Sequence, residues 1–426
     1  MKRALKLGAL SASNICIIFL FQWYLLTQLG PGIASDALFA AMTLPQLILA
    51  VISGSLMHAL VPLLSGKDKK RLYQDAWSFL FLIGSLFGLI ASLLYLSASW
   101  WVPLTVPGFG EAGKVLTVEL TRIQLIGMVF AGINGVQLAT YHASQRFLWA
   151  EFITVVSSFT GFVMLILALP EYGVVAAAWI GVLRMLIQTF LLAPGMGMPV
   201  LPDLESSEIK VAWQRIKPLL LGASYYKTDP LVDRFLLSMG SSGSLSLFYL
   251  AQQIYSAINQ IINSAFAAPL VVLLSTLHKV GDERSFRSAY RKKVWQISAI
   301  CMAIILALAL LGQNILSILM DHGKINSGNV NELWWIMIYL AGVFIGGALG
   351  QIFASAFYAI GDTATPTRMS LITYTIYIPG KISAFYYFGV TGLALATSVY
   401  YVVNCSVLAY FFGKYKFDDN TYTSHS

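Results

Sequence analysis

Four charged side chains lie within the apolar stretch from Pro218 to Gly240, which reads PLLLGASYYKTDPLVDRFLLSMG. They are Lys227, Asp229, Asp233 and Arg234, and the stretch is long enough to cross a bilayer. Each charge at the centre of a spanning helix costs roughly 2.5–3.5 kcal/mol on insertion scales, so four of them would almost cancel the apolar gain if they faced lipid. We therefore expect them to pair with neighbouring helices or to form the charged wall of a water-filled transport cavity.

The spacing of these charges separates them by sign. Lys227 and Arg234 are nearly two helical turns apart and share one face, whereas Asp229 and Asp233 are one turn apart and share another. Pro230 removes a backbone hydrogen bond and predicts a kink. A basic face of this kind could bind an anion such as a phosphate through charge-assisted hydrogen bonds. With two further charges inside apolar spans, the candidate cavity residues are Arg184, Lys227, Asp229, Asp233, Arg234 and Lys381.

The composition is that of a polytopic membrane protein. The 426 residues are 58% hydrophobic and 11% charged, whereas soluble domains contain about 25% charged residues. Three scattered cysteines and five histidines show no metal-ligand or disulfide spacing, and neither a phosphate-binding glycine loop nor a catalytic motif is recognisable. We therefore expect neither an enzyme nor a bound cofactor, and we interpret the net charge of +8 as a topology signal, not as a nucleic-acid-binding surface.

Hydropathy predicts an all-α protein with about twelve spanning helices in two lobes of six. The spans lie at roughly 7–29, 36–64, 76–99, 119–143, 148–169, 172–193, 216–239, 246–275, 294–319, 332–359, 367–388 and 390–412. The Pro-containing segment after the sixth span predicts a division into a first lobe (1–194), a cytoplasmic linker (195–215), a second lobe (216–413) and a cytoplasmic tail (414–426).

The basic residues predict the orientation in the membrane. With a cytoplasmic N-terminus, 20 of the 27 Lys and Arg residues lie in cytoplasmic segments, four lie within spans, and only Lys114, Arg122 and Lys324 lie on the opposite side. This bias places both termini in the cytoplasm.

The two predicted lobes read as repeats of one another. The segment Asp36–Ser65 aligns without gaps on Ser246–Ser275, and GVVAAAWIGV from Gly173 aligns on GVTGLALATS from Gly389. Because each lobe contains an even number of spans, both enter the membrane from the same side, as in parallel repeats related by an axis along the membrane normal. Two such lobes predict a central cavity and transport by alternating access.

Several segments resemble one family of bacterial transporters. ASDALFAAMTLPQLILAVISGSLMHALVPLLS, YHASQRFLWAEF and the stretch from Pro218 to Gln260 are similar to segments of the MviN/MurJ-type lipid II flippases, within the multidrug/oligosaccharidyl-lipid/polysaccharide exporter superfamily. The turn FYAIGDTATPTRMS from Phe357 to Ser370 is the most specific part. The resemblance implies a V-shaped pair of six-helix lobes in the bacterial cytoplasmic membrane, and it adds Asp36 to the cavity residues as the family's cavity acid.

The resemblance also implies a function. The family moves an undecaprenyl-pyrophosphate-linked glycan from the inner to the outer leaflet, which needs a hydrated basic cavity because the polar head cannot cross hydrocarbon unaided. No bond is made or broken. Implied partners are the lipid-linked glycan, the bilayer and glycan polymerase or glycosyltransferase machinery, and Na⁺, H⁺ or the membrane potential could drive transport.

The chain departs from the family at several charged positions. The stretch FQWYLLTQLG lacks the family's Arg-Asp pair, LPQLILAVISG lacks a basic pair, and AQQ at Ala251 to Gln253 replaces an acid–base pair. The family has fourteen helices, whereas twelve are predicted here. These departures favour an exopolysaccharide or O-antigen-type repeat unit as the glycan, with the peptidoglycan precursor lipid II as the other candidate.

Two other classes remain open on the sequence alone. In a cation-coupled exporter of small amphiphiles with the same two-lobed form, Asp36, Asp229 and Asp233 would bind the coupling cation. In a membrane scaffold without transport, the charges would only hold helices together.

Overall fold

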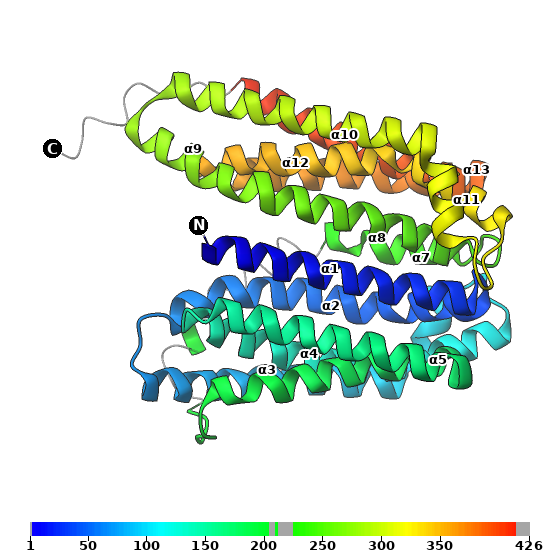
Figure 1. Ribbon diagram of the computed structural model, residues 1–426, viewed down its shortest axis with the longest axis horizontal. Helices are drawn as coiled ribbons and strands as arrows, with labels where there is room; N and C mark the ends of the chain where they lie inside the picture. Colours follow the sequence, from blue (N-terminus) through cyan, green and yellow to red (C-terminus); the bar gives the residue numbers. More distant parts are fainter. Residues whose placement is uncertain (1, 204–208, 212–224, 415–426) are drawn as a thin grey trace. The chain divides into compact units, whose positions relative to one another are not determined.

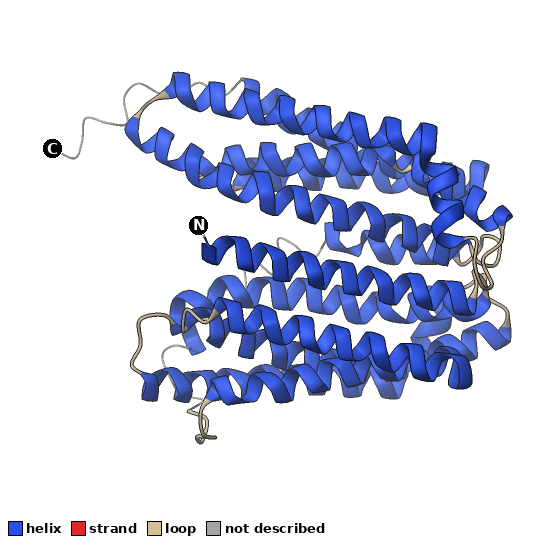
Figure 2. Ribbon diagram, in the orientation of Figure 1, coloured by secondary structure: helices blue, strands red, loops and turns tan. Residues whose placement is uncertain are grey.

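The computed structural model describes residues 2–203, 209–211 and 225–414, and all regular structure in these segments is helical (Figure 2). The predicted linker and the first half of the seventh span fall partly outside these residues, as does nearly all of the C-terminal tail. The long helices are α1 (Lys2–Leu29), α2 (Ile33–Leu64), α3 (Lys69–Thr105), α4 (Glu111–Ala143), α5 (Phe147–Leu192), α8 (Ser244–Ile262), α9 (Ala268–Val280), α10 (Glu283–Met320), α11 (Ser327–Tyr339), α12 (Ala341–Ala359) and α13 (Ala364–Gly413) (Figure 1). The short elements are η1 (Ala193–Met196), η2 (Tyr226–Thr228), α7 (Asp229–Leu237) and η3 (Asn263–Ala267).

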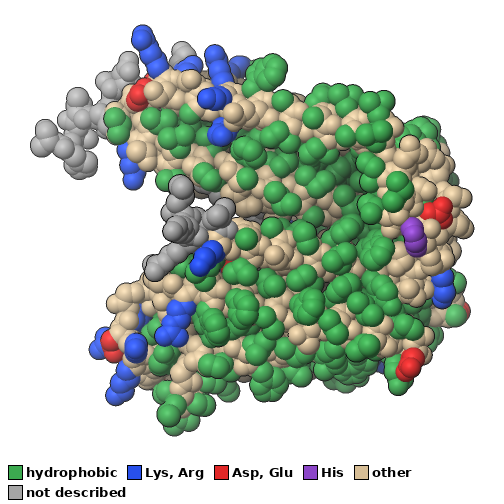
Figure 3. Space-filling model, in the orientation of Figure 1, with side chains coloured by type: hydrophobic (Ala, Val, Ile, Leu, Met, Phe, Trp, Pro, Cys, Tyr) green, Lys and Arg blue, Asp and Glu red, His purple; other side chains and the backbone are tan. Residues whose placement is uncertain are grey.

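These helices confirm the prediction of an all-α polytopic membrane protein. Nine helical segments in the described residues are long and apolar enough to span a membrane. Two of them, α5 and α13, each contain two predicted spans, so that the nine correspond to eleven of the twelve predicted. In Figure 3 hydrophobic side chains cover the flanks of the helices. Exposed fractions of 78% for Leu96, 84% for Trp100 and 77% for Leu310 are those of a surface that meets lipid.

Glycines divide the two longest helices. A straight helix of the 46 residues in α5 would be about 69 Å long, more than twice the hydrocarbon core of a bilayer. The backbone leaves helical geometry at Gly173 (φ 61°, ψ −150°), and α13 does the same at Gly389 (φ 61°, ψ −143°). Glycine adopts this positive φ without the cost that a Cβ atom imposes. The two kinks occupy positions that the predicted repeat aligns.

A second pair of matching turns has the same spacing. Gln145, after α4, and Gly361, after α12, both adopt the left-handed conformation, with φ of 59° and 83°. In each turn the next N–H donates to the carbonyl five positions earlier, at 2.9 and 3.0 Å, which is the Schellman arrangement that ends many helices. The two residues are 216 positions apart, as are the glycines at the two kinks. Local backbone geometry thus agrees with the repeat.

The described chain forms two compact units. The first contains residues 1–250 and 320–329, and the second contains 251–319 and 330–426. Within the first unit, α4 packs against α2, α3 and α5, and α1 packs against α5 (Figure 1). Helix α7 packs against α2 and α3 and belongs to this unit. The predicted lobe boundaries and the cavity between the lobes stay predictions.

The second unit is built around α12, which packs against α9 and α13. Three aromatic rings contact the Phe412 ring there: Phe286 is stacked on it, Tyr290 is tilted against it and Phe357 meets it edge to face. A Cβ atom on Gly342 would lie 2.7 Å from Ser398, and one on Gly346 would lie 2.5 Å from the backbone of Tyr401. Gly342 and Gly346 therefore allow α12 and α13 to approach closely.

Candidate transport site

Asp36, in the first turn of α2, is only 2% exposed and closes the N-terminus of another helix. Its Oδ2 atom accepts a hydrogen bond from the Gly243 N–H at 2.7 Å, and its Oδ1 atom accepts one from the Ser246 N–H at 2.8 Å. These donors flank the start of α8, where the first N–H groups lack partners within the helix. The carboxylate therefore caps α8 from outside and neutralises the positive end of its dipole.

Two turns that contain glycine bring the start of α2 next to the start of α8. Gly30 has φ 77°, and the Ser35 hydroxyl donates to its carbonyl at 2.8 Å, which fixes the entry into α2. Gly243 has φ 94°, and a Cβ atom there would lie 2.8 Å from Pro31. Glycine is therefore required at Gly243 both by its backbone conformation and by the close approach of the α2 turn.

Arg234 lies in the interior of the first unit beside this cap. Its side chain is 4% exposed, and its guanidinium lies over the Tyr249 ring at 4.9 Å from the centroid. The Tyr249 ring is stacked in turn on Phe39, with centroids 4.4 Å apart. The charge of Arg234 interacts with the carboxylates of Asp36, Asp229 and Asp233. Among the described residues, the Nε and Nη1 atoms of Arg234 find no hydrogen-bond acceptor.

The segment before α7 places the remaining charges of the seventh span. Lys227 lies in η2 and donates from Nζ to the Ala50 carbonyl of α2 at 2.5 Å. Both Lys227 and Asp229 are half-buried. Pro230 is at the start of α7, where its missing N–H costs no helical hydrogen bond. The expected kink is therefore a change from a 3₁₀ turn to an α-helix.

Arg184 lies in the same unit, in a different group of polar side chains. It donates from Nη1 to the Ser158 hydroxyl at 3.3 Å, and that hydroxyl donates to Asn14 of α1 at 2.7 Å. The aliphatic part of Arg184 covers Gly161, where a Cβ atom would lie 3.1 Å from it. This glycine allows the long side chain to lie between the two halves of α5.

A ladder of neutral polar side chains continues this group. Gln188 donates to the Thr154 hydroxyl at 3.1 Å, across the two halves of α5. The Thr189 hydroxyl donates to Asn134 of α4 at 2.7 Å, and Asn134 donates to the Met185 carbonyl at 3.1 Å. Sequence reasoning concentrated on charges and missed these residues, although amides and hydroxyls one turn apart inside apolar spans are the usual signal of hydrogen bonds between membrane helices.

Lys381 is in the second unit and is completely buried. Its ammonium lies 5.0 Å from the centroid of the Tyr377 ring. The Tyr377 hydroxyl shares a hydrogen bond of 2.9 Å with Thr397, and its ring stacks on Tyr400. An aromatic face of this kind stabilises a desolvated ammonium.

The structure thus brings Asp36, Lys227, Asp229, Asp233 and Arg234 into one region of the first unit, whereas the other two predicted residues lie elsewhere. None of the four cations predicted within spans is exposed, since Arg234 and Lys381 are buried and the other two are half-buried. Contact with a substrate stays a prediction for all seven.

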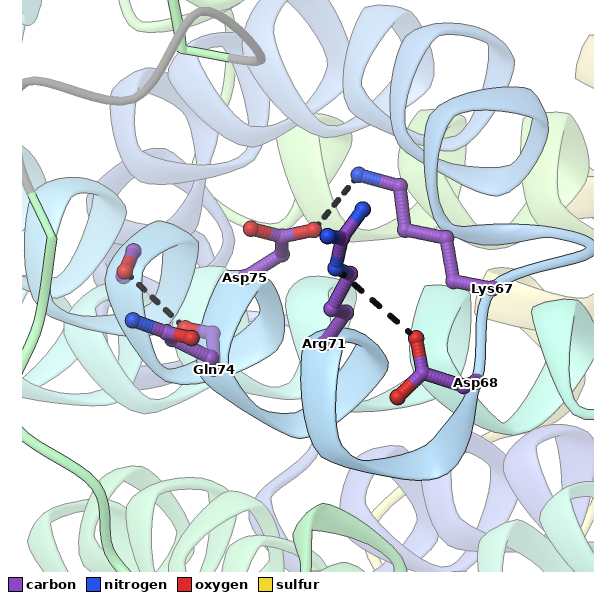
Figure 4. Close-up of polar contacts among 6 residues, drawn as sticks. Lys67, Asp68, Arg71, Gln74 and Asp75 are labelled. Carbon is purple, nitrogen blue, oxygen red and sulfur yellow. Dashed lines mark hydrogen bonds and ion pairs between the residues drawn. The ribbon is translucent and has the colours of Figure 1, made fainter.

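A separate ionic cluster lies at the turn between α2 and α3 (Figure 4). Lys67 pairs with Asp75 at 2.5 Å, and Arg71 lies 4.0 Å from Asp68. Together with Gln74 these residues line a pocket of about 420 Å³. Opposite charges satisfy one another there, so the cluster holds the turn and offers no excess charge to an anion.

The chain is similar to known proteins over nearly its whole length. It is 23% identical over 408 residues to a probable lipid II flippase MurJ from Vibrio cholerae, covering 89% of this chain and 76% of that protein. The probable lipid II flippase MurJ of Bdellovibrio bacteriovorus is 21% identical and matches 97% of this chain and 83% of its own length. A solved lipid II flippase MurJ in the inward closed conformation has a TM-score of 0.81 at 18% identity, covering 96% of this chain and 88% of that one.

A second solved structure has a similar fold. An inward-facing multidrug resistance transporter of the MATE family, in the MOP superfamily, has a TM-score of 0.76 at 16% identity and covers 94% of this chain and 93% of its own. The polytopic helical fold and its long apolar spans therefore define a multi-pass membrane protein whose fold is that of these transporters. Residues 25–423 match the model of the family Lipid II flippase MurJ, and the chain belongs to that family. The predicted resemblance is confirmed.

Proposed function

We propose that this protein moves an undecaprenyl-pyrophosphate-linked oligosaccharide from the inner to the outer leaflet of the bacterial cytoplasmic membrane by alternating access. The match to the flippase family over both halves of the chain carries the proposal. Both termini lie in the cytoplasm in this proposal, and Na⁺, H⁺ or the membrane potential drives transport. Glycosyltransferases supply the substrate, and a glycan polymerase consumes it.

The charged side chains of the first unit are a candidate binding site for the pyrophosphate of this substrate. A pyrophosphate needs cationic hydrogen-bond donors in a region that excludes lipid. The Lys227 ammonium uses one of its three donors on the Ala50 carbonyl, which leaves two for an anion. Asp229 and Asp36 limit how strongly that anion is held, so that it can be released in the outer leaflet.

Flipping of a fluorescent lipid-linked oligosaccharide in proteoliposomes tests both the function and the residue. We expect Lys227→Arg to retain partial transport and Lys227→Gln to abolish it, with both variants folded and inserted like wild type. Arg71→Gln, at the exposed cytoplasmic turn, is the matched control and should transport normally.

Three results would count against the proposal. Normal flipping by Lys227→Gln removes this residue from the mechanism. If less of the Lys227→Gln variant is found in the membrane, and adding Asp229→Asn or Asp233→Asn restores the amount, the role of the lysine is structural. Failure of the wild-type protein to flip any lipid-linked glycan, together with export of a cationic dye, identifies a small-amphiphile exporter instead.

A competition experiment distinguishes the candidate glycans. Unlabelled exopolysaccharide-type and O-antigen-type lipid-linked repeat units should inhibit flipping of the fluorescent substrate more strongly than lipid II, because the chain lacks charged pairs that the family carries near the helix-1 end, in helix 2 and in helix 8. Stronger inhibition by lipid II would assign the peptidoglycan precursor.

A further inference from the structure

A pocket of about 700 Å³ opens between the end of α3, the first half of α4 and the part of α5 that follows the kink at Gly173, all on the predicted extracytoplasmic side. Its lining combines charged groups with two aromatic side chains, Tyr95 and Trp179, which are 40% and 44% exposed. Aromatic residues of this kind are typical of the membrane–water interface. All elements around the pocket belong to the first unit.

Arg122 of α4 is held in place at this pocket. It donates from Nη2 to the Ser99 hydroxyl at 3.0 Å and from Nε to the Tyr95 carbonyl at 3.3 Å, and its guanidinium lies 5.3 Å from the centroid of the Tyr95 ring. Two of its five N–H donors are used in these bonds, and three remain. No carboxylate among the described residues lies within ion-pair distance of Arg122. The guanidinium is therefore fixed in position and retains donors for an anion.

The other charges of the pocket decide which headgroup fits. Lys114 and Glu111 bind each other at 3.2 Å and largely cancel. Glu119 remains, one turn before Arg122 on the same helix, where side chains three residues apart are neighbours. With partners counted only within the described ranges, the pocket thus presents one cationic group and one carboxylate that form no ion pair.

An apolar groove continues from the pocket along the same two helices. A second cavity of about 430 Å³ shares Tyr95 and Ile126 with the first and is lined by Gly88, Leu96 and Val129 among others. The seven residues from Tyr95 to Gly88 correspond to about 10 Å along α3. A Cβ atom on Gly88 would meet no other heavy atom within 4 Å, so this glycine leaves open space instead of allowing close helix packing.

We propose that the pocket and the groove together bind one phospholipid with a primary ammonium in its headgroup, of the phosphatidylethanolamine type. Its phosphate accepts hydrogen bonds from Arg122, its ammonium donates to Glu119, and one acyl chain lies along the groove past Gly88. With the predicted topology, this lipid belongs to the outer leaflet. The site lies on the flank of the first unit and is separate from the charges assigned to the transported glycan.

The test is native mass spectrometry of the delipidated full chain in detergent, titrated with phosphatidylethanolamine, phosphatidylcholine or phosphatidylglycerol. Wild type should retain phosphatidylethanolamine in preference to both other lipids. Arg122→Gln should weaken its binding about tenfold, as expected for the loss of charge-assisted hydrogen bonds to phosphate. Glu119→Gln should remove the preference over phosphatidylcholine.

A substitution at Gly88 tests the contribution of the groove to lipid binding. Gly88→Leu places an apolar side chain in the groove, at a position where the added Cβ atom would meet no heavy atom within 4 Å, and should reduce phospholipid binding about as much as Arg122→Gln. Gly350→Leu, at an equally open helical position in the second unit, should have no effect. Thermal unfolding temperatures close to wild type confirm that each variant is folded.

Several outcomes would overturn the proposal. Equal binding by wild type, Arg122→Gln and the control Arg71→Gln excludes the headgroup contact. Normal binding by Gly88→Leu excludes the groove. Preference for phosphatidylglycerol assigns an anionic lipid, and competition by a lipid-linked oligosaccharide at this site assigns the transported substrate. None of these results depends on whether the protein flips glycans.

Discussion

Replacing Asp36 by Asn tests whether this residue is first of all a structural cap. The carboxylate accepts two backbone N–H groups, from Gly243 and Ser246, and is 2% exposed. Asn has nearly the same shape but only one acceptor oxygen, and its NH₂ group would face the second N–H donor. One charge-assisted hydrogen bond is lost and one buried donor is left unpaired, at about 1.5–3 kcal/mol for the bond and about 1–3 kcal/mol for the donor. These two costs overlap, so we expect a loss of about 3 kcal/mol in unfolding free energy.

The measurement is thermal or denaturant-induced unfolding of the purified protein in detergent. Asp282→Asn is the matched control, because Asp282 accepts the Ser285 N–H at 2.9 Å at an exposed helix start. Water can replace that bond, so the control should lose much less stability than Asp36→Asn.

Transport by the same variant separates two roles of Asp36. If Asp36→Asn is as stable as the control but fails to flip substrate, the cap is not its main role, and direct action on the glycan or a coupling cation is favoured. A stability loss with proportional loss of transport supports the cap. Wild-type stability and wild-type transport together would refute the reasoning from the two hydrogen bonds.

Three further predictions concern residues outside the transport site. Gly361→Ala should destabilise by about 1 kcal/mol, because only its positive φ is unfavourable, whereas the helical control Gly88→Ala should not destabilise; unfolding midpoints compare them. A double-mutant cycle on Lys67 and Asp75 should give a coupling of about 0.5–1 kcal/mol that falls in high salt. Burial alone would raise the pKa of Asp362, but hydrogen bonds from the Thr365 side chain and from two backbone N–H groups hold that pKa below its usual value. Its stabilisation is therefore complete above the ordinary pKa of about 3.9 and is lost as pH falls through the lower folded value, so Asp362→Asn should be destabilising at pH 7 and the difference from wild type should shrink as the pH falls below that range.

Much of the fold follows from the sequence because a membrane restricts the choices. Uninterrupted apolar runs must form helices, since unpaired backbone groups cannot face hydrocarbon. Charges within spans must be enclosed, and the four cations are indeed buried or half-buried. The kinks at Gly173 and Gly389 follow from helix length, because one bilayer cannot contain 46 or 50 residues of straight helix.

The detailed geometry of the site could not be predicted in this way. The cap formed by Asp36 joins residues 207 and 210 positions apart, and helix periodicity contains no signal for that contact. The left-handed conformation of Gln145 could not be predicted either, because the sequence there lacks the glycine that usually marks such a turn. The polar ladder through Asn134 and Gln188 had a sequence signal, but only tertiary structure shows which side chains meet.

The contact at Asp36 lies within the first unit and joins positions that the predicted repeat aligns. In the predicted repeat Asp36 aligns with Ser246, and its carboxylate accepts the Ser246 N–H. Phe39 aligns with Tyr249, and the two rings are stacked. The chemistry at this point is not symmetric, since a carboxylate faces a serine N–H and one phenyl ring faces a phenol. Arg234 lies against the phenol side only. The side chains that differ between the aligned positions are therefore the ones that provide the partners of two buried charges, Asp36 and Arg234.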